Sequence, residues 1–454
     1  MGFGSEDLAS IERLISLGLG GPVDIGGGGL IEFDYVIIGN GAAGVGGVEG
    51  IRKLDPKGTI VVVGDETALP YSRCYLTGYI SGRNSEKSMT YRPSSFYERN
   101  NVQLLTGRRA VSLSAADKKV LLDDDFQLRY GKLLLATGSS AVMPDLKGMR
   151  LPGVYVLRTV KDAQAISMGA KVVRKAVIMG GGLVGIGAAI ALHDMGLEVH
   201  LVVASHQVLS QNLDRRAAEM VTEHLRLHGV DVQLDLDVVE VLGLDRVRGV
   251  RLSDGRTLEC EMLVSAKGVR MNSDLAESAG ISVRRGVVVD DRMRSSASGV
   301  YAAGDVAEAK DFISGKSATF TLWPIASEQG RVAGFNMAGG EQAYPGGVQI
   351  TAVEFLGMPL VSIGDTRQPK YPSDLEERVE NSVGVGSYRK SMLKGGKAIG
   401  AILVGPIVER KELTNIPCTR IDPRLVRELL LKDSVDFGRL SDLLLMRIGP
   451  ASSS

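Results

Sequence analysis

The chain has 454 residues, which is too many for one ordinary hydrophobic core, so two or three domains are expected. Its 53 basic and 53 acidic side chains balance, so no general attraction to nucleic acid or to an anionic membrane is encoded. The three cysteines, Cys74, Cys260 and Cys418, form no CxxC pair. This composition predicts no metal site, iron–sulfur cluster or disulfide framework and favours a cytoplasmic protein. No apolar run reaches the ~18 residues of a membrane-spanning helix, and the acidic start is not typical of a secretory signal.

The first 30 residues precede the first predicted strand. A glycine-rich linker occupies 18–29, and before it apolar residues recur at helical spacing, at Leu8, Ile11, Leu14 and Ile15. This N-terminal extension, 1–30, is interpreted as a short helix that lies on its own domain. A docking helix for another subunit is the alternative.

A glycine-rich turn follows the first short apolar run, over 36–38. Gly39, Gly41 and Gly44 have the Gly-x-Gly-x-x-Gly spacing, and a helix is predicted from Ala42. The first glycine permits a tight turn, the second leaves room for a pyrophosphate, and the third lets helix and strand pack closely. Phosphates then lie at the helix N-terminus, which favours negative charge. The pattern predicts dinucleotide binding.

Charged residues follow the second predicted strand, over 59–63. Glu66 comes 22 residues after Gly44, at the spacing where a carboxylate binds ribose hydroxyls of a dinucleotide. Arg73 lies shortly after it, in the segment Pro-Tyr-Ser-Arg. Its guanidinium is suited to a bidentate pair with a phosphate, or to a surface salt bridge.

Two later strands end in residues that suit a cofactor site. The apolar run 133–135 ends in Ala-Thr-Gly at 136–138, where a small residue lets backbone pass close to a cofactor. The run 299–303 is followed by Gly304 and Asp305. This aspartate is suited to accept a hydrogen bond from a cofactor polyol, or to cap a helix.

The strand–glycine–helix unit occurs a second time. A strand over 175–179 is followed by Gly180, Gly182 and Gly185, then by a predicted helix to about 195 and a strand over 198–203. Two such units are more specific than one and predict two dinucleotide-binding domains.

The pattern changes from about residue 347. Strands are predicted over 349–355, 383–387 and 398–403, and helices over 423–432 and 439–445. Together with the two units before it, this predicts an α/β chain with two Rossmann-like domains and an α+β C-terminal domain.

This ordered set of motifs resembles the pyridine nucleotide–disulfide oxidoreductase superfamily, and is most similar to rubredoxin reductases and the flavin module of the NADH nitrite reductase large subunit. The resemblance implies an FAD-binding domain in two pieces, 31–150 and 270–340. It places an NAD(P)-binding domain at 151–269 and a C-terminal interface domain at 341–450.

The resemblance also implies which residues bind the cofactors. Glu66 would hold the adenosine ribose, Ala110 would meet the adenine through its backbone, and Asp305 would bind the ribitol chain. The FAD contacts implied in this way are Gly39, Asn40, Gly41, Ala42, Ala43, Gly44, Glu66, Arg73, Ala110, Ala136, Thr137, Gly138, Gly304 and Asp305. The NAD(P) contacts are Gly180, Gly182, Leu183, Val184, Gly185 and Gly268. The helix after Trp323 would direct its N-terminus to the flavin, where it stabilises negative charge.

The second unit departs from the family pattern in three places. Gly187 stands where an acidic residue is usual, Val203 stands where a carboxylate binds the NAD ribose, and Lys267 replaces a common threonine. No arginine lies near enough to replace the carboxylate as a 2′-phosphate ligand, since the nearest are Arg215 and Arg216. NAD(H) is therefore the expected nicotinamide cofactor, and NADP(H) stays open.

The sequence favours an FAD-dependent oxidoreductase that passes electrons between NAD(P)H and a redox-protein acceptor, as the flavin subunit of a larger iron–sulfur enzyme. The C-terminal domain would mediate a homodimer or hetero-oligomer. A first alternative is a disulfide or peroxide reductase, or an NADH oxidase, that depends on Cys74. This cysteine lies near the redox position of single-cysteine relatives, although Pro-Tyr-Ser-Arg belongs to another branch and Ala42 and Ala43 stand where the peroxidase branch has a histidine. Thr77-Gly78 also lacks the lysine that is common in ferredoxin-reductase relatives. A second alternative is a structural or assembly subunit whose flavin does no NAD chemistry.

Overall fold

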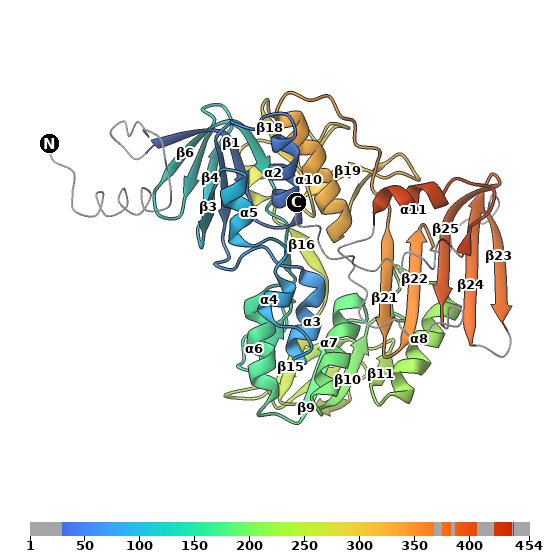
Figure 1. The fold of residues 1–454 in the computed structure, drawn as a ribbon. Coiled ribbons are helices and arrows are strands. Elements are labelled where there is room, and N and C mark those ends of the chain that lie inside the picture. Colours follow the sequence, from blue (N-terminus) through green and yellow to red (C-terminus); the bar gives the residue numbers. More distant parts are fainter. Residues whose placement is uncertain (1–29, 367–374, 383–385, 406–421, 438, 440–454) are drawn as a thin grey trace.

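The computed structural model describes residues 30–366, 375–382, 386–405, 422–437 and 439. The helix predicted near the start of the chain and nearly all of the helix predicted over 439–445 lie outside the described residues. Figure 1 shows three parts, namely two parallel sheets, one above the other, and an antiparallel sheet beside them.

The first parallel sheet carries the first glycine turn, and only its edge strands over 110–122 pair in antiparallel fashion. Its strands are β1 (Leu30–Ile38), β2 (Ile60–Gly64), β3 (Val102–Thr106), β4 (Ala110–Ser114), β5 (Lys119–Leu122), β6 (Gln127–Leu135) and β18 (Val300–Ala302), in the order β3-β2-β1-β6-β5-β4 with β18 beside β6. Val36 of β1 lies opposite Val61 of β2 and Leu133 of β6, and Val300 of β18 also lies opposite Leu133. Because these four strands are parallel, their carboxyl ends meet at one edge of the sheet.

Two helices rich in small residues pack together against this sheet, α2 (Ala42–Arg52) and α10 (Trp323–Met337). A Cβ atom at Gly330 would lie 2.1 Å from the Ala43 carbonyl oxygen, and one at Gly334 would lie 2.0 Å from that of Gly47. Their backbones therefore touch. The short helices that follow β2 are η1 (Arg73–Tyr75), α3 (Leu76–Ile80), α4 (Glu86–Met89) and α5 (Ser94–Arg99).

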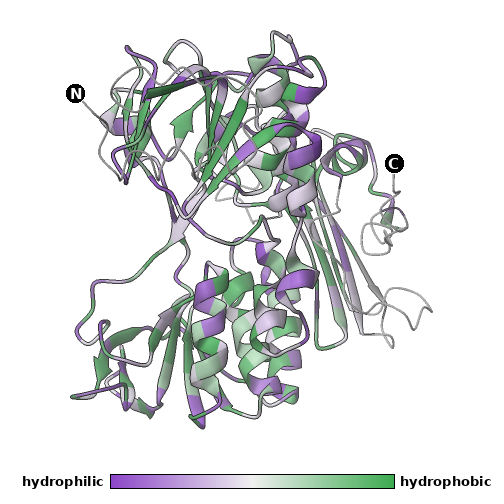
Figure 2. Ribbon diagram, turned by 60° about the vertical axis from the view of Figure 1, so that its left-hand side comes forward, coloured by the Kyte–Doolittle hydropathy of each residue, from purple (hydrophilic) through white to green (hydrophobic). Residues whose placement is uncertain are grey.

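The second parallel sheet repeats the arrangement. Its strands are β8 (Val154–Val156), β9 (Lys175–Met179), β10 (Glu198–Val203), β11 (Asp231–Leu234) and β15 (Met262–Ser265), in the order β11-β10-β9-β15-β8. Its helices are α6 (Val160–Ala170), α7 (Leu183–Asp194) and α8 (Arg215–Leu227). Figure 2 shows that the inner strands of both parallel sheets are mainly hydrophobic. This agrees with strands that are covered on both faces.

The antiparallel sheet follows near the end of the chain. Its strands are β21 (Ile350–Phe355), β22 (Met358–Gly364), β23 (Leu375–Ser382), β24 (Ser387–Lys394) and β25 (Lys397–Val404), in the order β21-β22-β25-β24-β23, and α11 (Pro423–Leu429) lies at one end. Strand β21 is thus an edge strand. The strand predicted over 383–387 was misplaced, because Gly386 lies in a turn and the described strands end at Ser382 and begin at Ser387.

Smaller elements connect these sheets. They are β7 (Ser139–Ala141) paired with β16 (Val269–Met271), the sheet of β12 (Val238–Leu242), β13 (Gly249–Leu252) and β14 (Thr257–Glu259), the sheet of β17 (Val287–Val288), β19 (Ala307–Lys310) and β20 (Ser317–Thr319), and helix α9 (Asp274–Ser278).

Buried polar groups hold the antiparallel sheet against the second parallel sheet. The carboxylate of Asp214, the residue that caps α8, accepts a hydrogen bond from Tyr388 Oη at 2.6 Å and lies 3.0 Å from Lys390 Nζ. The Asn212 side chain also donates to Thr351 Oγ1 at 2.9 Å. The predicted fold class, two Rossmann-like α/β domains and an α+β C-terminal part, is confirmed.

Candidate cofactor site

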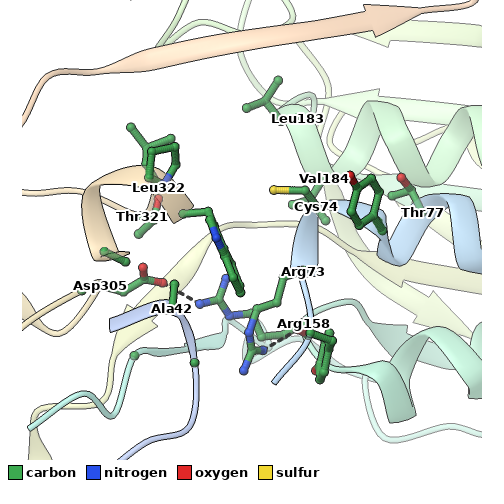
Figure 3. A pocket seen from close by; sticks show the side chains of 18 of the residues that line it. Ala42, Arg73, Cys74, Thr77, Arg158, Leu183, Val184, Asp305, Thr321 and Leu322 are labelled. Carbon is green, nitrogen blue, oxygen red and sulfur yellow. Dashed lines mark hydrogen bonds and ion pairs between the residues drawn. The ribbon is translucent and has the colours of Figure 1, made fainter. Parts of the chain in front are cut away.

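A cavity of about 640 Å³ lies where the three parts meet. Its walls come from the ends of the first sheet, from the starts of α3, α7 and α10, and from the edge strand β21. Figure 3 shows side chains from these elements directed into it, with Asp305 and Thr321 on one side and Leu183 and Val184 on the other.

The first glycine turn forms part of the cavity wall. Gly39 has φ +115°, and a Cβ there would lie 2.0 Å from the Ala136 carbonyl oxygen. A Cβ at Gly44 would lie 1.9 Å from the Gly39 oxygen, whereas one at Gly41 would meet nothing within 4 Å. The outer glycines are therefore required for packing, and the middle one leaves open space beside the N-terminus of α2. That is the cradle a pyrophosphate needs.

Glu66 lies at the cavity wall within a small polar network. Its Oε1 pairs with Arg73 Nη2 at 2.9 Å, and its Oε2 accepts a hydrogen bond from Tyr71 Oη at 2.6 Å. Burial raises the pKa of the Tyr71 hydroxyl above its usual range, so this group stays a donor at neutral pH. Arg73 was predicted to pair with a phosphate or to form a surface salt bridge. The structure contains a salt bridge, and its partner is Glu66, the candidate ribose ligand.

Asp305 lies at the end of β18 and is held by two donors. Ser139 Oγ donates to its Oδ2 at 2.6 Å, and Arg158 Nη2 pairs with the same oxygen at 2.5 Å. Strand β19 follows Asp305, so the alternative that it caps a helix is wrong. Its other oxygen, Oδ1, is left for a ligand hydroxyl.

One short segment links these two networks. The Arg158 carbonyl oxygen accepts a hydrogen bond from Arg73 Nη1 at 2.6 Å, and the Val160 amide donates to Tyr71 Oη at 2.9 Å. Residues 158 and 159 precede α6 of the second sheet, and Val160 is the first residue of that helix. This segment therefore contacts both carboxylates of the cavity, through Arg158 at one end and through Tyr71 and Arg73 at the other.

The N-terminus of α10 forms the adjoining wall. Pro324 occupies its first turn, as is favoured where an amide would lack a partner. The Trp323 ring meets the ring of Tyr91 edge to face, with centroids 5.0 Å apart. The buried Trp323 Nε1 has no hydrogen-bond partner among the described residues. In the glycine turn, Asn40 Oδ1 accepts a hydrogen bond from Tyr97 Oη.

The second glycine turn has the same local shape but lies largely outside this cavity. Gly180 has φ +122°, and a Cβ at Gly185 would lie 1.8 Å from its carbonyl oxygen. Only Leu183 and Val184 of the predicted nucleotide contacts in this turn line the cavity. At the end of β10, Val203 packs on Gly181, to within 2.8 Å of a Cβ placed there.

Two departures from the family pattern meet in space. A Cβ at Gly187 of α7 would lie 2.9 Å from Thr77 Cγ2 of α3. Gly187 stands where the family has an acidic residue and Thr77 where relatives have a lysine. In this chain the two positions instead form a close contact between α7 and α3. Lys267, another departure of the second unit, is paired with Asp237, with Nζ 2.6 and 2.8 Å from the two carboxylate oxygens.

The cysteines differ from the expectation in one respect. Cys74 lines the cavity and is disulfide-bonded, although the composition predicted no disulfide framework. Its sulfur points toward the centre of the cavity in Figure 3. Cys260 is a free, buried cysteine, and burial raises the pKa of its thiol to about 12. Cys418 lies outside the described residues.

The structure thus brings most of the predicted FAD contacts together. The predicted residues that line the cavity are Gly39, Asn40, Gly41, Ala42, Ala43, Glu66, Arg73, Ala136, Thr137, Gly138, Gly304 and Asp305. Ala110 lies in β4 and is absent from the lining, and Gly44 packs behind the turn. Arg158 was missed, because a lone arginine between a short strand and a helix gives no signal of its role.

In the part of the chain that the structure describes, no helix has the length and apolar character needed to cross a membrane. The same residues contain no group of three or more histidine, cysteine, aspartate or glutamate side chains placed to hold a metal ion.

The fold and the cavity define a class of protein. Two parallel sheets, with glycine turns at the carboxyl ends of β1 and β9, and a shared cavity between them are the architecture of a two-nucleotide oxidoreductase. Residues 33–330 match the family model of the pyridine nucleotide-disulphide oxidoreductases. The chain belongs to this family, whose members bind FAD and NAD(P)H.

The similar proteins include both a separate subunit of an enzyme and longer single-chain enzymes. The chain is 33% identical over 408 residues to subunit epsilon of an NADH-dependent phenylglyoxylate dehydrogenase from Aromatoleum evansii, which covers 89% of this chain and 96% of that subunit. It is 31% identical to a nitrite reductase [NAD(P)H] from Bacillus subtilis, covering 83% of this chain. The chain spans about half of that enzyme and of an assimilatory nitrate reductase electron transfer subunit, 46% and 51%.

Solved structures agree with this family. A ferredoxin reductase from Rhodopseudomonas palustris superposes with a TM-score of 0.76 at 27% identity, covering 82% of this chain and 91% of that one. An NADH:rubredoxin oxidoreductase from Clostridium acetobutylicum gives a TM-score of 0.67, also at 27% identity, covering 82% and 92%.

Proposed function

We propose that the chain is an FAD-dependent oxidoreductase that passes electrons between NAD(P)H and a redox-protein acceptor, as the flavin subunit of a larger iron–sulfur enzyme. The observation that carries the proposal is the cavity itself. The first glycine turn, Glu66 and Asp305 all line it together with Leu183 and Val184 of the second unit, and Figure 3 shows Asp305 on one side of it and Leu183 and Val184 on the other. A flavin held by the first wall would thus face a nicotinamide that arrives from the second.

The residues of the first wall would hold FAD as follows. The open space at Gly41 admits the pyrophosphate, the free acceptor capacity of Glu66 takes a ribose hydroxyl, and Asp305 Oδ1 takes a ribityl hydroxyl. The N-terminus of α10 directs its positive end toward developing negative charge. Ala110 is not among the residues that line the cavity, so its contact with the adenine stays a prediction.

The protein's share of the chemistry is binding, orientation and electrostatics. When bound, FAD supplies the hydride and single-electron chemistry. Leu183 and Val184 on one side of the cavity, and Leu322 just before α10, are apolar lining residues. They would keep water out of the enclosed space, which strengthens charge interactions there. The nicotinamide nucleotide would lie with its phosphates on Gly180 and Gly182, at the N-terminus of α7.

The subunit role is supported by the extent of the similarity. The chain covers 96% of subunit epsilon of the phenylglyoxylate dehydrogenase but only about half of the nitrite reductase. A free-standing flavin subunit that hands electrons to other polypeptides fits this pattern better than one module of a single-chain enzyme. The acceptor would then be a redox protein or an iron–sulfur subunit.

The test is anaerobic reduction of the purified flavoprotein. Addition of NADH should bleach the flavin absorbance near ~450 nm, a property of the oxidised cofactor. If neither NADH nor NADPH bleaches it while dithionite does, the proposal fails and the alternative of a structural or assembly subunit stands.

A matched variant sharpens this experiment. A Cβ at Gly182 would meet nothing within 4 Å, so Gly182→Ala should fold normally while it crowds an approaching pyrophosphate. We expect this variant to keep FAD and to be bleached by dithionite, with NADH reduction slowed by at least about tenfold, the factor that 1.4 kcal/mol represents.

The disulfide at Cys74 favours a second candidate function, a disulfide or peroxide reductase. Cytosolic disulfides are usually transient and catalytic or redox-sensing, and this one lies in the cavity wall. Similar proteins include an NADH oxidase from Methanocaldococcus jannaschii, 32% identical, and an NAD(P)H sulfur oxidoreductase (CoA-dependent) from Pyrococcus abyssi, 28% identical. Turnover of peroxide and of a small disulfide by Cys74→Ser decides, because unchanged rates would exclude this function.

The domain organisation and setting are proposals of the same kind. The division into 31–150 with 270–340, 151–269 and 341–450 is supported by the three separate sheets. The antiparallel sheet is proposed as the interface for a homodimer or hetero-oligomer, and the low cysteine content supports a cytoplasmic protein.

A further inference from the structure

Strand β21 forms a wall of the cavity from the edge of the antiparallel sheet. All of its residues, Ile350–Phe355, line the cavity. Among the strands that the structure describes, β21 pairs only with β22, where Ser362 lies opposite Thr351. The position of this wall relative to the two parallel sheets therefore depends on contacts that reach the hairpin of β21 and β22 from outside its own sheet.

The second unit supplies one such contact through Asn212. This buried side chain lies in the loop between β10 and α8, and its Nδ2 donates to Thr351 Oγ1 at 2.9 Å. Its carbonyl oxygen accepts hydrogen bonds from Ser362 Oγ of β22 and from Thr366 Oγ1, the latter at 2.8 Å. One residue of the second unit thus holds both strands of the hairpin, through its side chain and through its backbone.

The same loop is anchored on the second glycine turn. The Leu209 amide donates to the Gly181 carbonyl oxygen at 2.8 Å, and the Asn212 amide donates to the Leu209 carbonyl oxygen at 2.8 Å. Leu209 is buried and has φ +50°, a left-handed conformation that is uncommon outside glycine. Three successive hydrogen bonds therefore connect Gly181 of the turn with Thr351 of the cavity wall.

The far end of the strand is held by the same unit. His224 Nε2, on α8, lies 3.0 and 3.1 Å from the carbonyl oxygens of Phe355 and Leu356. A ring nitrogen that serves carbonyl oxygens must carry a proton. Leu356 and Gly357, which connect β21 to β22, both have positive φ, +50° and +84°, as in a type I′ hairpin turn. The second unit thus contacts β21 near both of its ends.

A fixed wall matters because a hydride is transferred only over a short distance. Reacting atoms must approach to about 3–3.5 Å, and a displacement of about 1 Å can cost roughly 100-fold in rate. The second glycine turn would hold the phosphates of a nicotinamide nucleotide, and β21 would bound the space that its ring enters. The loop that carries Asn212 connects these two boundaries.

We propose that Asn212 is a positioning residue, which acts through Thr351 to hold the cavity wall β21 at a set distance from the second glycine turn and so sets the rate of flavin reduction by a nicotinamide nucleotide. In that reaction a hydride with its electron pair leaves NADH, which is oxidised, and is taken up by the flavin, which is reduced. Asn212 is absent from the cavity lining, so it touches neither reactant. The inference rests on the proposed function in one respect, that the nucleotide enters by the second unit.

Two substitutions remove the hydrogen bond from opposite ends. Asn212→Ala removes the donor, and Thr351→Val removes the acceptor with little change in size. Tyr388→Phe is the matched control, because the Tyr388 hydroxyl donates to Asp214 at 2.6 Å across the same contact between the two sheets, and Tyr388 does not line the cavity. Each variant is measured as the full-length flavoprotein, by thermal unfolding and by anaerobic stopped-flow reduction over a range of NADH concentrations.

For Asn212→Ala and for Thr351→Val we expect the limiting rate of flavin reduction to fall at least about tenfold, while the half-saturating NADH concentration stays within about twofold of wild type. The double variant should lie within about twofold of the slower single variant, because both changes remove the same hydrogen bond. Tyr388→Phe should lower the thermal midpoint by at least roughly 2 °C and keep the wild-type rate.

The proposal is overturned if Asn212→Ala keeps the wild-type limiting rate, even when its thermal midpoint falls. It is also overturned if Tyr388→Phe slows reduction as much, because Asn212 is then only one part of the contact between the sheets. A higher half-saturating NADH concentration at an unchanged limiting rate would count against it equally, since that result describes nucleotide binding and not positioning.

Hydrogen exchange over 348–358 tests the positioning without any nucleotide. We expect this segment to exchange faster in Asn212→Ala than in wild type and in Tyr388→Phe, because the strand loses a contact that holds it closed. Equal exchange in all three would overturn the proposal. A wild-type protein that neither NADH nor NADPH reduces would refute the proposed function instead, and hydrogen exchange then decides the positioning by itself.

Discussion

A buried ion pair lies in the contact between the antiparallel sheet and the second parallel sheet, and Lys390→Met tests its contribution to stability. Lys390 and Asp214 have side chains that are 2% and 5% exposed, 3.0 Å apart. Removing one partner of a buried pair costs about 3–5 kcal/mol, since the other charge stays buried. Asp214 would keep the hydroxyl of Tyr388 and the amide of Ala217 as donors, which places the expected loss near ~3 kcal/mol.

The assay is thermal unfolding followed by circular dichroism and by calorimetry. A loss of this size lowers the midpoint of a cooperative unit of 150–250 residues by roughly 6–12 °C. Lys397→Met is the matched control, because Lys397 and Asp433 form an exposed pair, 55% and 85% exposed. Such a pair contributes less than about 1 kcal/mol.

Two results would refute the reasoning. The first is a Lys390→Met midpoint within about 2 °C of Lys397→Met, on the same scale of about 2–4 °C per kcal/mol. The second concerns the double variant Asp214→Asn/Lys390→Met, in which neither position carries a charge and only the part-exposed Glu377, 2.9 Å from Lys390 in the wild type, loses an ionic partner. It should recover part of the loss, and simple additivity of the single losses would show that the unpaired carboxylate is not the cause.

Further predictions concern the glycine turn and the buried thiol. Gly39→Ala should destabilise the protein by at least about 2 kcal/mol and abolish FAD binding, because its Cβ would lie 2.0 Å from the Ala136 oxygen at φ +115°; normal unfolding in urea would contradict this. Gly41→Ala should unfold like wild type and bind FAD at least about tenfold more weakly, since only the ligand meets the added methyl; unchanged affinity would contradict it. Cys260, whose thiol pKa burial raises to about 12, should resist iodoacetamide at pH 8 and react only in denaturant, as mass spectrometry can show; rapid labelling of native protein would contradict its burial.

The sequence predicted the parts of the site that short-range spacing determines. Gly39, Gly41 and Gly44 belong to one turn, and the turn needs those residues at that spacing whatever surrounds it. Glu66 and Asp305 each follow the end of a buried apolar strand, where parallel strands deliver side chains to one edge. At these residues the sequence spacing alone determines where the side chain lies in the fold.

The parts that were missed depend on contacts between distant segments. Arg158 meets Asp305 across 147 residues, and Thr77 meets Gly187 across two helices of different sheets. The strand predicted over 383–387 missed most of β24, which begins at Ser387 and carries the buried Lys390. Its partner Asp214, which makes the burial possible, lies on the other parallel sheet.

The first parallel sheet is assembled from two separated stretches of chain, and this has a consequence for the order in which a newly made chain can fold. Strand β6 ends at Leu135, and its neighbour β18 begins only at Val300. The strands of the second sheet, 154–265, all lie in between. As the chain leaves the ribosome from its N-terminus, the second sheet can therefore be complete before the first. If Asp305 holds FAD as proposed, that contact can form only after the strands of the second sheet have emerged.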